Sequence, residues 1–325
     1  MSQYTNYLSI ATVLQYVPFN EIVINTAKYV LTGILKSGSI PQHVSFIMDG
    51  NRRYAKMNQL ELFEGHEAGS VSLMRIIEAC YDLGIKHASI YAFSIENFNR
   101  SNEEITKLFE LLVDKLCKLE DEKYDYSKFL QIRIIGNKSL IPKETLERLE
   151  RVEENSKTNV GGLVLNINFC YTSRDEIAHS VSKTVSDVID QNITINQISS
   201  EVINDNFYFY PDTPPVDLLV RTSGHTRLSD YLIWHVNESN SRIEFLNIYW
   251  PDFTEFDFYS ILLKMSYEKM MKKGTQKVRT LAGYKDSHLP NYIWDYENYK
   301  VDDKRVELKS LKEHPPFVSI LGEKL

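Results

Sequence analysis

A short apolar run that ends abruptly in charged and polar residues constrains the fold most. Residues 43–48 include the β-branched Val44 and Ile47, and such a run is typical of a strand buried on both faces. Directly after it come Asp49, Gly50, Asn51, Arg52 and Arg53. Ligands of open α/β sheets bind outside the carboxyl ends of strands, and a helix beginning soon after Asn51 would direct free N–H groups at the same place.

A carboxylate, two arginines and a helix start together suit a diphosphate with its magnesium ion. Mg²⁺ is commonly held by one or two carboxylates and by phosphate oxygens, so Asp49 alone would be enough protein ligand. The alternative is that Asp49-Gly50-Asn51 is only a turn, because Asp, Gly and Asn favour turns. This strand end taken by itself leaves both interpretations open.

Composition excludes several other classes of protein. A chain of 325 residues, 43% of them hydrophobic, is long enough to bury a large core. With 44 acidic and 37 basic side chains the net charge is −7, which argues against a protein that coats nucleic acid, so any anion site must be local. The three cysteines stand far apart, which indicates neither a zinc site nor a disulfide framework. We see no membrane span and no secretory signal.

The pattern along the chain alternates strands with helices. The expected strands cover residues 43–48, 86–93, 129–135, 163–169, 216–220 and 242–245, and the expected helices include 101–119, 142–156, 175–190, 228–234 and 256–271. Capping boxes are expected at Ser101–Glu104 and Ser173–Glu176. Alternation of this kind predicts an α/β fold with a central, mostly parallel sheet of about six strands flanked by helices.

The predicted domain covers residues 39–274, and a further segment lies on each side of it. In residues 1–38, apolar residues such as Val23, Ala27, Val30 and Ile34 recur at helical spacing, which predicts an amphipathic helix within residues 10–36. That helix would lie either in a membrane interface or against the main domain or a partner. Residues 275–325 are charged and weakly patterned, as in a tail.

Basic and polar residues follow three of the expected strands. Because the carboxyl ends of parallel strands meet at one edge of a sheet, these residues should converge there. The three groups are Asp49 with Arg52 and Arg53; Ser94, Asn97 and Arg100; and Arg221, Arg227 and Ser229. Guanidinium groups match phosphate oxygens two at a time, so the convergence predicts a local site for two phosphate groups.

Five motifs stand in the order found in the cis-prenyltransferases. They are His43-x-x-x-Ile-Met-Asp-Gly-Asn-x-Arg, Gly-His66-Glu-x-Gly, Ala-Phe-Ser94-x-Glu-Asn-Phe-x-Arg, Arg221-Thr-Ser-Gly-x-x-Arg-Leu-Ser and Trp250-Pro-Asp-Phe253. Over residues 40–267 the chain resembles this family, and within it the eukaryotic, particularly fungal, dehydrodolichyl diphosphate synthase catalytic subunits. The resemblance implies the undecaprenyl diphosphate synthase-like fold, a hydrophobic tunnel and a dimeric assembly.

The resemblance also implies roles for individual residues. Asp49 would ligate Mg²⁺ on an allylic diphosphate, with Glu244 as a second carboxylate near the metal. The allylic diphosphate site would be lined by Gly50, Asn51, Arg52, Arg53 and His66, and isopentenyl diphosphate would be held by Arg221, Arg227 and Ser229. A loop that closes over the substrates would carry Ser94, Glu96, Asn97 and Arg100. Of these residues, Asn97 and Arg100 are expected to be catalytic, as is Asp49. Trp250–Phe253 would be structural.

The implied reaction adds isopentenyl diphosphate units in Z configuration to an allylic starter such as farnesyl diphosphate, giving a long polyprenyl diphosphate for dolichol synthesis and protein glycosylation. The proton would leave to a diphosphate oxygen or to Asp49. The growing hydrocarbon needs apolar walls, because burying each methylene away from water is favourable by about 0.8 kcal/mol of free energy. Expected walls are the helices at Val71–Leu83 and Ile105–Leu119.

Departures from the family pattern bear on partners. Leu62 stands where many bacterial relatives carry an arginine, and His225 where many carry a glutamate. The C-terminal Arg-x-Gly motif of family members that are active without a partner is absent, and the nearest stretch is Ile320-Leu-Gly322. We therefore expect a hetero-oligomer with a Nogo-B-receptor-type accessory subunit, with a homodimer as the alternative, at the cytosolic face of the endoplasmic reticulum membrane or on lipid droplets.

Two other classes remain as competing interpretations. A non-catalytic accessory subunit of the same fold would typically lack the acid of Asp49-Gly-Asn, so Asp49 argues against it. A nucleotide-binding α/β enzyme would carry a glycine-rich phosphate loop, and neither G-x-G-x-x-G nor G-x-x-x-x-G-K-[ST] is present in the sequence.

Overall fold

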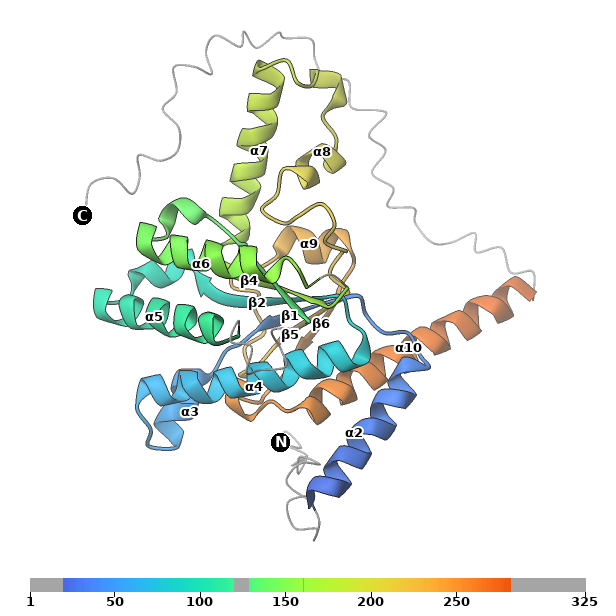
Figure 1. Cartoon of the computed structure of the whole chain (residues 1–325). Helices are drawn as coiled ribbons and strands as arrows, with labels where there is room; N and C mark the ends of the chain where they lie inside the picture. Colours follow the sequence, from blue (N-terminus) through green and yellow to red (C-terminus); the bar gives the residue numbers. More distant parts are fainter. Residues whose placement is uncertain (1–19, 120–128, 160, 282–325) are drawn as a thin grey trace, which may run out of the picture. The chain divides into compact units, whose positions relative to one another are not determined.

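The computed structural model describes residues 20–119, 129–159 and 161–281. The chain divides after Gly274 into two units, and the fold below is that of the first. Its centre is a six-stranded sheet in which all neighbouring strands are parallel, in the order β3-β4-β2-β1-β5-β6 (Figure 1). The strands are β1 (His43–Ile47), β2 (His87–Ser94), β3 (Leu130–Ile135), β4 (Leu163–Tyr171), β5 (Leu218–Arg221) and β6 (Arg242–Phe245). The predicted α/β class and parallel sheet are confirmed.

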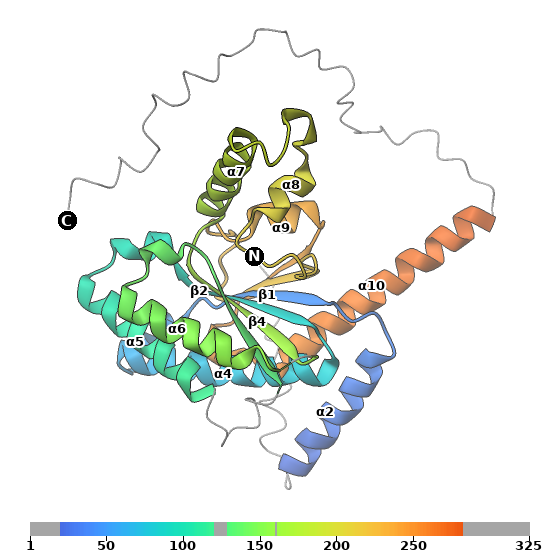
Figure 2. The same cartoon turned by 45° about the horizontal axis from the view of Figure 1, so that its top comes forward.

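Helices cover both faces of this sheet (Figures 1 and 2). The first face carries α4 (Leu62–Leu83), α5 (Asn102–Leu119), α6 (Lys143–Ser156) and α10 (Glu255–Leu281), and the second carries α7 (Ser173–Ile189), α8 (Ser200–Asp205) and α9 (Ile233–Glu238). The main core lies under the first group, where Ile76, Phe109, Leu149 and Phe258 are buried together with apolar strand residues. Short helix α3 (Asn51–Met57) follows β1, and the 3₁₀ turn η1 (Ile95–Asn99) follows β2.

Two glycines let α4 pack closely on α3. A Cβ atom at Gly65 would lie 2.5 Å from the backbone oxygen of Asn51, and one at Gly69 would lie 2.4 Å from the Asn51 side-chain oxygen. Trp250 fixes the same corner, because its indole N–H donates to the carbonyl oxygen of Gly69 at 2.8 Å and its ring packs on Phe46. Trp250 is 1% exposed, which agrees with the structural role expected of it.

The N-terminal helix α2 (Asn20–Lys36) packs against the main core with one face. Leu35 is buried, and Lys28 lies 2.5 Å from the carboxylate of Glu255. Val30 and Ile34 from the predicted apolar stripe are instead half exposed. The part of the prediction that covers residues 10–19 lies outside the described residues. Within the described ranges, no helix is long and apolar enough to cross a bilayer.

Two local predictions are wrong. Residues 228–232 are not helical, because Ser229, Asp230 and Leu232 have φ of 52°, 57° and 48°, and α9 begins only at Ile233. Ser173–Glu176 is not a capping box: Thr172 caps α7 by accepting from the backbone N–H of Asp175. The carboxylate of Glu176 is buried instead, where the hydroxyl of Tyr171 donates to it at 2.6 Å.

Candidate active site

The expected convergence of strand ends is present at the carboxyl edge of β1, β5 and β2. Asp49 follows β1, and Arg221 is the last residue of the adjacent strand β5. The hydroxyl of Thr222 accepts from the backbone N–H of Asp49 at 3.1 Å and donates to its carbonyl oxygen at 2.7 Å. Side-chain and backbone contacts therefore join the two strand ends directly.

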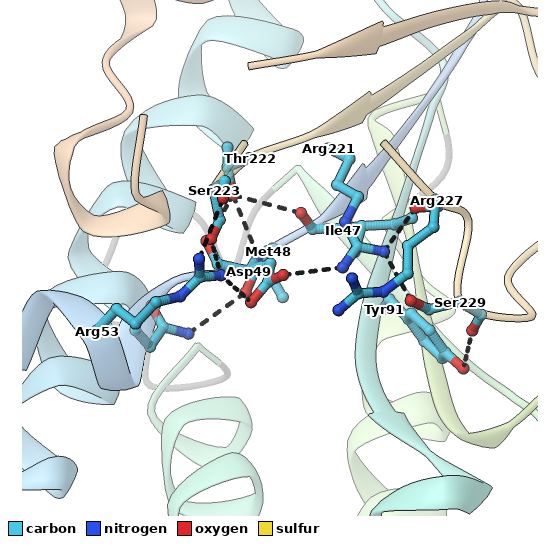
Figure 3. Close-up of polar contacts among 11 residues, drawn as sticks. Ile47, Met48, Asp49, Arg53, Tyr91, Arg221, Thr222, Ser223, Arg227 and Ser229 are labelled. Carbon is cyan, nitrogen blue, oxygen red and sulfur yellow. Dashed lines mark hydrogen bonds and ion pairs between the residues drawn. The ribbon is translucent and has the colours of Figure 1, made fainter. Parts of the chain in front are cut away.

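The carboxylate of Asp49 lies between two guanidinium groups (Figure 3). One oxygen is 3.3 Å from Nη2 of Arg53, and the other accepts from Nη2 of Arg221 at 2.9 Å. Arg53 also donates to the carbonyl oxygen and the hydroxyl of Ser223. The guanidinium of Arg227 is turned towards the same space (Figure 3). Three arginines around one aspartate give this edge a positive charge in a chain whose net charge is −7.

Arg221 holds the site together from inside the protein. Its side chain is 3% exposed, and Nη1 donates to the carbonyl oxygen of Arg227 at 2.6 Å and to Oγ of Ser229 at 2.7 Å. Burial lowers the pKa of Arg221, and the bond to Asp49 opposes that effect. Among the described residues, none accepts a hydrogen bond from its buried Nε. Arg221 therefore fixes Asp49 relative to the loop at residues 227–232.

A cavity of about 830 Å³ opens below this edge. Its polar rim contains ten of the predicted site residues: Asp49, Asn51, His66, Ser94, Glu96, Asn97, Arg100, Arg221, Arg227 and Ser229. Its walls are apolar: Val71, Leu73 and Met74 come from α4, Leu108, Leu111, Leu112 and Leu116 from α5, and Phe93 and Phe169 from the sheet. Both helices expected as walls line the cavity.

His66 is neutral at pH 7. Its pKa is lowered to about 4, mainly because the ring is buried and to a smaller extent because of the charges of Arg100 and Arg52. A neutral imidazole can donate one hydrogen bond and accept another, but it adds no positive charge to the rim. The arginines therefore carry the charge of the site.

The turn η1 fixes Ser94 and Asn97 through reciprocal hydrogen bonds. The side-chain oxygen of Asn97 accepts from the backbone N–H of Ser94 at 3.1 Å, and Oγ of Ser94 accepts from the backbone N–H of Glu96 at 3.2 Å. Arg100 follows the turn and donates to the carboxylate of Glu104 at 2.8 Å. These local contacts bring Arg100 to the cavity rim.

The structure does not bring four predicted residues to the cavity. Gly50 has φ of 112°, and a Cβ atom there would lie 2.8 Å from the ring of Tyr249, so glycine is needed for the backbone. Arg53 lies beside Asp49 but outside the lining, and Arg52 is exposed, 3.7 Å from Glu104. Glu244, on the edge strand β6, binds Arg242 and is likewise not a lining residue.

One carboxylate at the rim fits a magnesium ion that a diphosphate also holds. The described residues contain no group of three or more His, Cys, Asp or Glu side chains that could hold a metal by themselves. Mg²⁺ dehydrates reluctantly and prefers carboxylate and phosphate oxygens, so Asp49 is a sufficient donor only when substrate supplies the other oxygens.

Reasoning from the sequence also missed residues of the rim. Arg174, in the first turn of α7, and Asp230 both line the cavity. The available signal was the position of Arg174, which follows the buried strand β4 as Asp49 follows β1. Tyr91 also acts here, since its hydroxyl lies 3.3 Å from the carbonyl oxygen of Ser229 and donates to it.

Comparisons with known proteins agree with this geometry. Residues 47–273 match the model of the undecaprenyl diphosphate synthase family of prenyltransferases. A dehydrodolichyl diphosphate synthase complex subunit of Saccharomyces cerevisiae is 36% identical over 297 residues, which cover 90% of this chain and 84% of the relative. A subunit of that complex from Homo sapiens is 37% identical over 249 residues, 76% of this chain and 73% of the relative.

A solved structure supports the same conclusion. Lavandulyl diphosphate synthase from Lavandula x intermedia, in complex with dimethylallyl diphosphate, superposes with a TM-score of 0.63 at 28% identity and covers 69% of this chain and 94% of its own. The chain therefore belongs to the undecaprenyl diphosphate synthase-like family of cis-prenyltransferases.

Proposed function

We propose that this chain is the catalytic subunit of a dehydrodolichyl diphosphate synthase, which adds isopentenyl diphosphate units in Z configuration to an allylic starter such as farnesyl diphosphate. The observation that carries the proposal is the set of three arginines around Asp49 at the mouth of an apolar cavity. Such a site suits substrates with a charged diphosphate at one end and a hydrocarbon at the other.

The two diphosphates would occupy neighbouring parts of the rim. Asp49, Asn51, His66 and Arg100 belong to the part formed by α3, α4 and the residues that follow β1 and η1, which suits the allylic diphosphate. The loop with Arg227 and Ser229 forms the other part, which suits isopentenyl diphosphate. Arg221 stands between them, bonded to Asp49 on one side and to the loop on the other.

Mg²⁺ would be held by Asp49 together with diphosphate oxygens. When bound, it would neutralise the charge that develops on the leaving diphosphate. The cavity-lining position of Asp49 and its hard oxygen atoms support this assignment. Because Glu244 lies on the edge strand β6, paired with Arg242 of that strand and Lys264 of α10, we assign the metal to Asp49 alone among the protein carboxylates.

The chain's own residues would stabilise the break between C1 of the allylic substrate and its diphosphate. Guanidinium donors fixed in advance are effective because they need no reorganisation as negative charge develops. The double bond of isopentenyl diphosphate then forms the new bond to C1, and a proton leaves C2. Because Asp49 is already assigned to the metal, we assign that proton to a diphosphate oxygen.

The growing chain would extend into the cavity between α4 and α5. Moving a methylene group from water to an apolar environment is favourable by about 0.8 kcal/mol of free energy, so a longer hydrocarbon binds the apolar walls more strongly. The leucines of α5 and the residues Val71, Leu73 and Met74 of α4 supply these walls. We infer that this cavity is the entrance of the expected hydrophobic tunnel.

The relatives' names and helix α2 support a proposal for the assembly and the location. Because the yeast and human relatives are named as complex subunits, we propose a hetero-oligomer with a Nogo-B-receptor-type accessory subunit, with a homodimer as the alternative. The exposed apolar residues Ile22, Tyr29, Val30 and Ile34 of α2 suit peripheral contact with a membrane. We place the enzyme at the cytosolic face of the endoplasmic reticulum, with lipid droplets as the alternative.

The test is an assay with farnesyl diphosphate, labelled isopentenyl diphosphate and Mg²⁺, with and without the accessory subunit. Asp49→Asn should lower turnover roughly a hundredfold or more, because it removes the metal-holding charge. Asp205→Asn, at an exposed position of α8, is the matched control and should behave as wild type. Full activity in Asp49→Asn would identify the chain as a non-catalytic accessory subunit.

A further inference from the structure

Arg174 joins two loops at the mouth of the cavity. It is the second residue of α7, its side chain is 74% exposed, and none of the roles above uses it. Its Nη2 donates to the carboxylate of Glu96 at 2.7 Å, and its Nε donates to the carboxylate of Asp230 at 2.7 Å. All three residues line the cavity, so this bridge lies beside the substrate-binding rim.

The Asp230 side of the bridge is a loop in an unfavourable conformation. Ser229, Asp230 and Leu232 have positive φ, which residues with side chains adopt only when surrounding contacts hold them there. The first turn of α7 supplies such contacts: the backbone N–H of Ser173 donates to the carbonyl oxygen of Asp230 at 2.7 Å, and that of Arg174 donates to its carboxylate at 3.2 Å. The loop that carries Arg227 and Ser229 is therefore anchored on α7.

The Glu96 side of the bridge is held more weakly. No residue of η1 is buried. Apart from the Ser94–Asn97 contacts, its links to the protein include the ring of Phe98, which packs on Phe93 at 5.1 Å, and the Glu96–Arg174 pair. A segment with few buried contacts opens at low cost in free energy, so the pair with Arg174 influences where η1 lies.

We propose that Arg174 is a positioning residue that couples the two diphosphate subsites. Its guanidinium links η1, which bears Asn97 and leads to Arg100, with the loop that bears Arg227 and Ser229. Isopentenyl diphosphate binds this anchored loop and further fixes Asp230 and Arg174, and Arg174 then favours the position of η1 that completes the allylic site. This inference rests on the proposed function and adds to it an affinity coupling, which by linkage acts equally in both directions.

The coupling can be measured without turnover. Isopentenyl diphosphate is titrated by calorimetry into the full chain with its accessory subunit, in the presence and in the absence of farnesyl thiolodiphosphate, an unreactive allylic analogue. In wild type the analogue should tighten isopentenyl diphosphate binding roughly three- to tenfold, the range of a few charge-assisted hydrogen bonds at a partly exposed site. The ratio of the two dissociation constants of isopentenyl diphosphate, without and with the analogue, should fall close to one in Arg174→Gln.

Four further variants separate coupling from a merely structural role. Glu96→Gln should lower the ratio as Arg174→Gln does, and the double variant should be no worse than either, because both cut the same link. Arg174→Lys should retain part of it. Arg148→Gln breaks the surface pair with Asp114, 3.1 Å long, and should leave the ratio unchanged.

The outcomes are distinct from those of the proposed function. A wild-type ratio in Arg174→Gln, or additive losses in the double variant, would overturn the coupling while leaving Asp49-dependent turnover intact. A wild-type complex that binds neither ligand would overturn the proposed function itself. Thermal unfolding of each variant accompanies the titrations, and a lowered melting temperature with an unchanged ratio assigns Arg174 a structural role and refutes the inference.

Discussion

The two halves of the rim are built on opposite principles. The half formed by Asp49, Arg221 and Thr222 is fixed by the buried side chains of Arg221 and Thr222, which bond to the carboxylate of Asp49 and to the backbone oxygens of Arg227 and Asp49. The half formed by η1 contains no buried residue and is fixed mainly by contacts within its own turn. One half is thus preorganised by the fold, whereas the other can move at small cost.

This difference suits a reaction that repeats. A donor set that stabilises the leaving diphosphate acts best when it is rigid, because then no free energy is spent on reorganisation in the transition state. Substrates must nevertheless enter and the product must shift after each addition, which requires one side of the rim to open. The contrast predicts that variants of the fixed half lose stability and activity together, whereas variants of η1 mainly lose substrate affinity.

The largest effect is expected for Arg221→Ala. Removing a buried guanidinium leaves one oxygen of Asp49 and the loop at residues 227–232 without their donor, and breaking such a pair costs about 3–5 kcal/mol. We expect the free energy of unfolding to fall by that order and KM to rise for both substrates, since Arg221 touches both subsites. Urea unfolding and steady-state kinetics measure the two effects.

Arg133→Ala is the matched control for Arg221→Ala. Arg133 is also buried, and it forms a bidentate pair with Asp212 at 2.7 Å on both arms, but it does not line the cavity. It should lower stability without changing either KM. Should Arg221→Ala raise KM for isopentenyl diphosphate alone, Arg221 would be a simple ligand rather than the link between the two diphosphate subsites.

How much of this structure the sequence predicts depends on whether the interactions that fix each segment are local or join residues far apart in the sequence. Strands and helices follow local periodicity, so the parallel sheet and the walls of the cavity are predicted well. Residues 228–234 have a helical pattern, yet Arg221 bonds to Arg227 and Ser229 and imposes a turn on this segment. Such a contact between side chain and backbone leaves no periodic signal, and tertiary structure overrides local propensity there.

The site shows the same limit. Asp49, Arg221 and Arg227 could be predicted because each stands at or after the end of a strand, and strand ends of a parallel sheet meet at one edge. Glu244 also stands at a strand end, but on the edge strand, where Arg242 and Lys264 bind its carboxylate. Arg174 binds partners that are 56 and 78 residues away in sequence, and no spacing in the sequence indicates those pairs.

A second prediction concerns the other end of β1, which should be as rigid as the end that bears Asp49. His43 is buried and bonds to Ser89 at 2.7 Å, and burial lowers its pKa to about 3. An unfolded histidine has a pKa of about 6.5 and binds a proton first as pH falls, so the native state loses stability from pH 6.5 downwards. We expect a loss of about 3 kcal/mol by pH 4, measured as urea midpoints.

His43→Gln tests the origin of that pH dependence. Glutamine can still donate and accept hydrogen bonds but does not titrate, so the slope of stability between pH 6.5 and 4 should become shallower. An unchanged slope would assign the pH dependence to other groups, with His87 and His66 as the next candidates, since burial lowers the pKa of each to about 4.

The smallest effect on stability is expected in the mobile half, for Phe98→Ala. Phe98 is 36% exposed and contacts Phe93 and Phe109, so its truncation should cost only about 1 kcal/mol of unfolding free energy. The position of η1 depends on this contact, and KM for the allylic diphosphate should therefore rise several-fold with little change in kcat. Phe63→Ala, at a more exposed aromatic residue of α4 that does not line the cavity, controls for loss of a surface ring. If Phe98→Ala instead lowered stability as much as Arg221→Ala did, the two halves would be equally fixed and the contrast between them would fail.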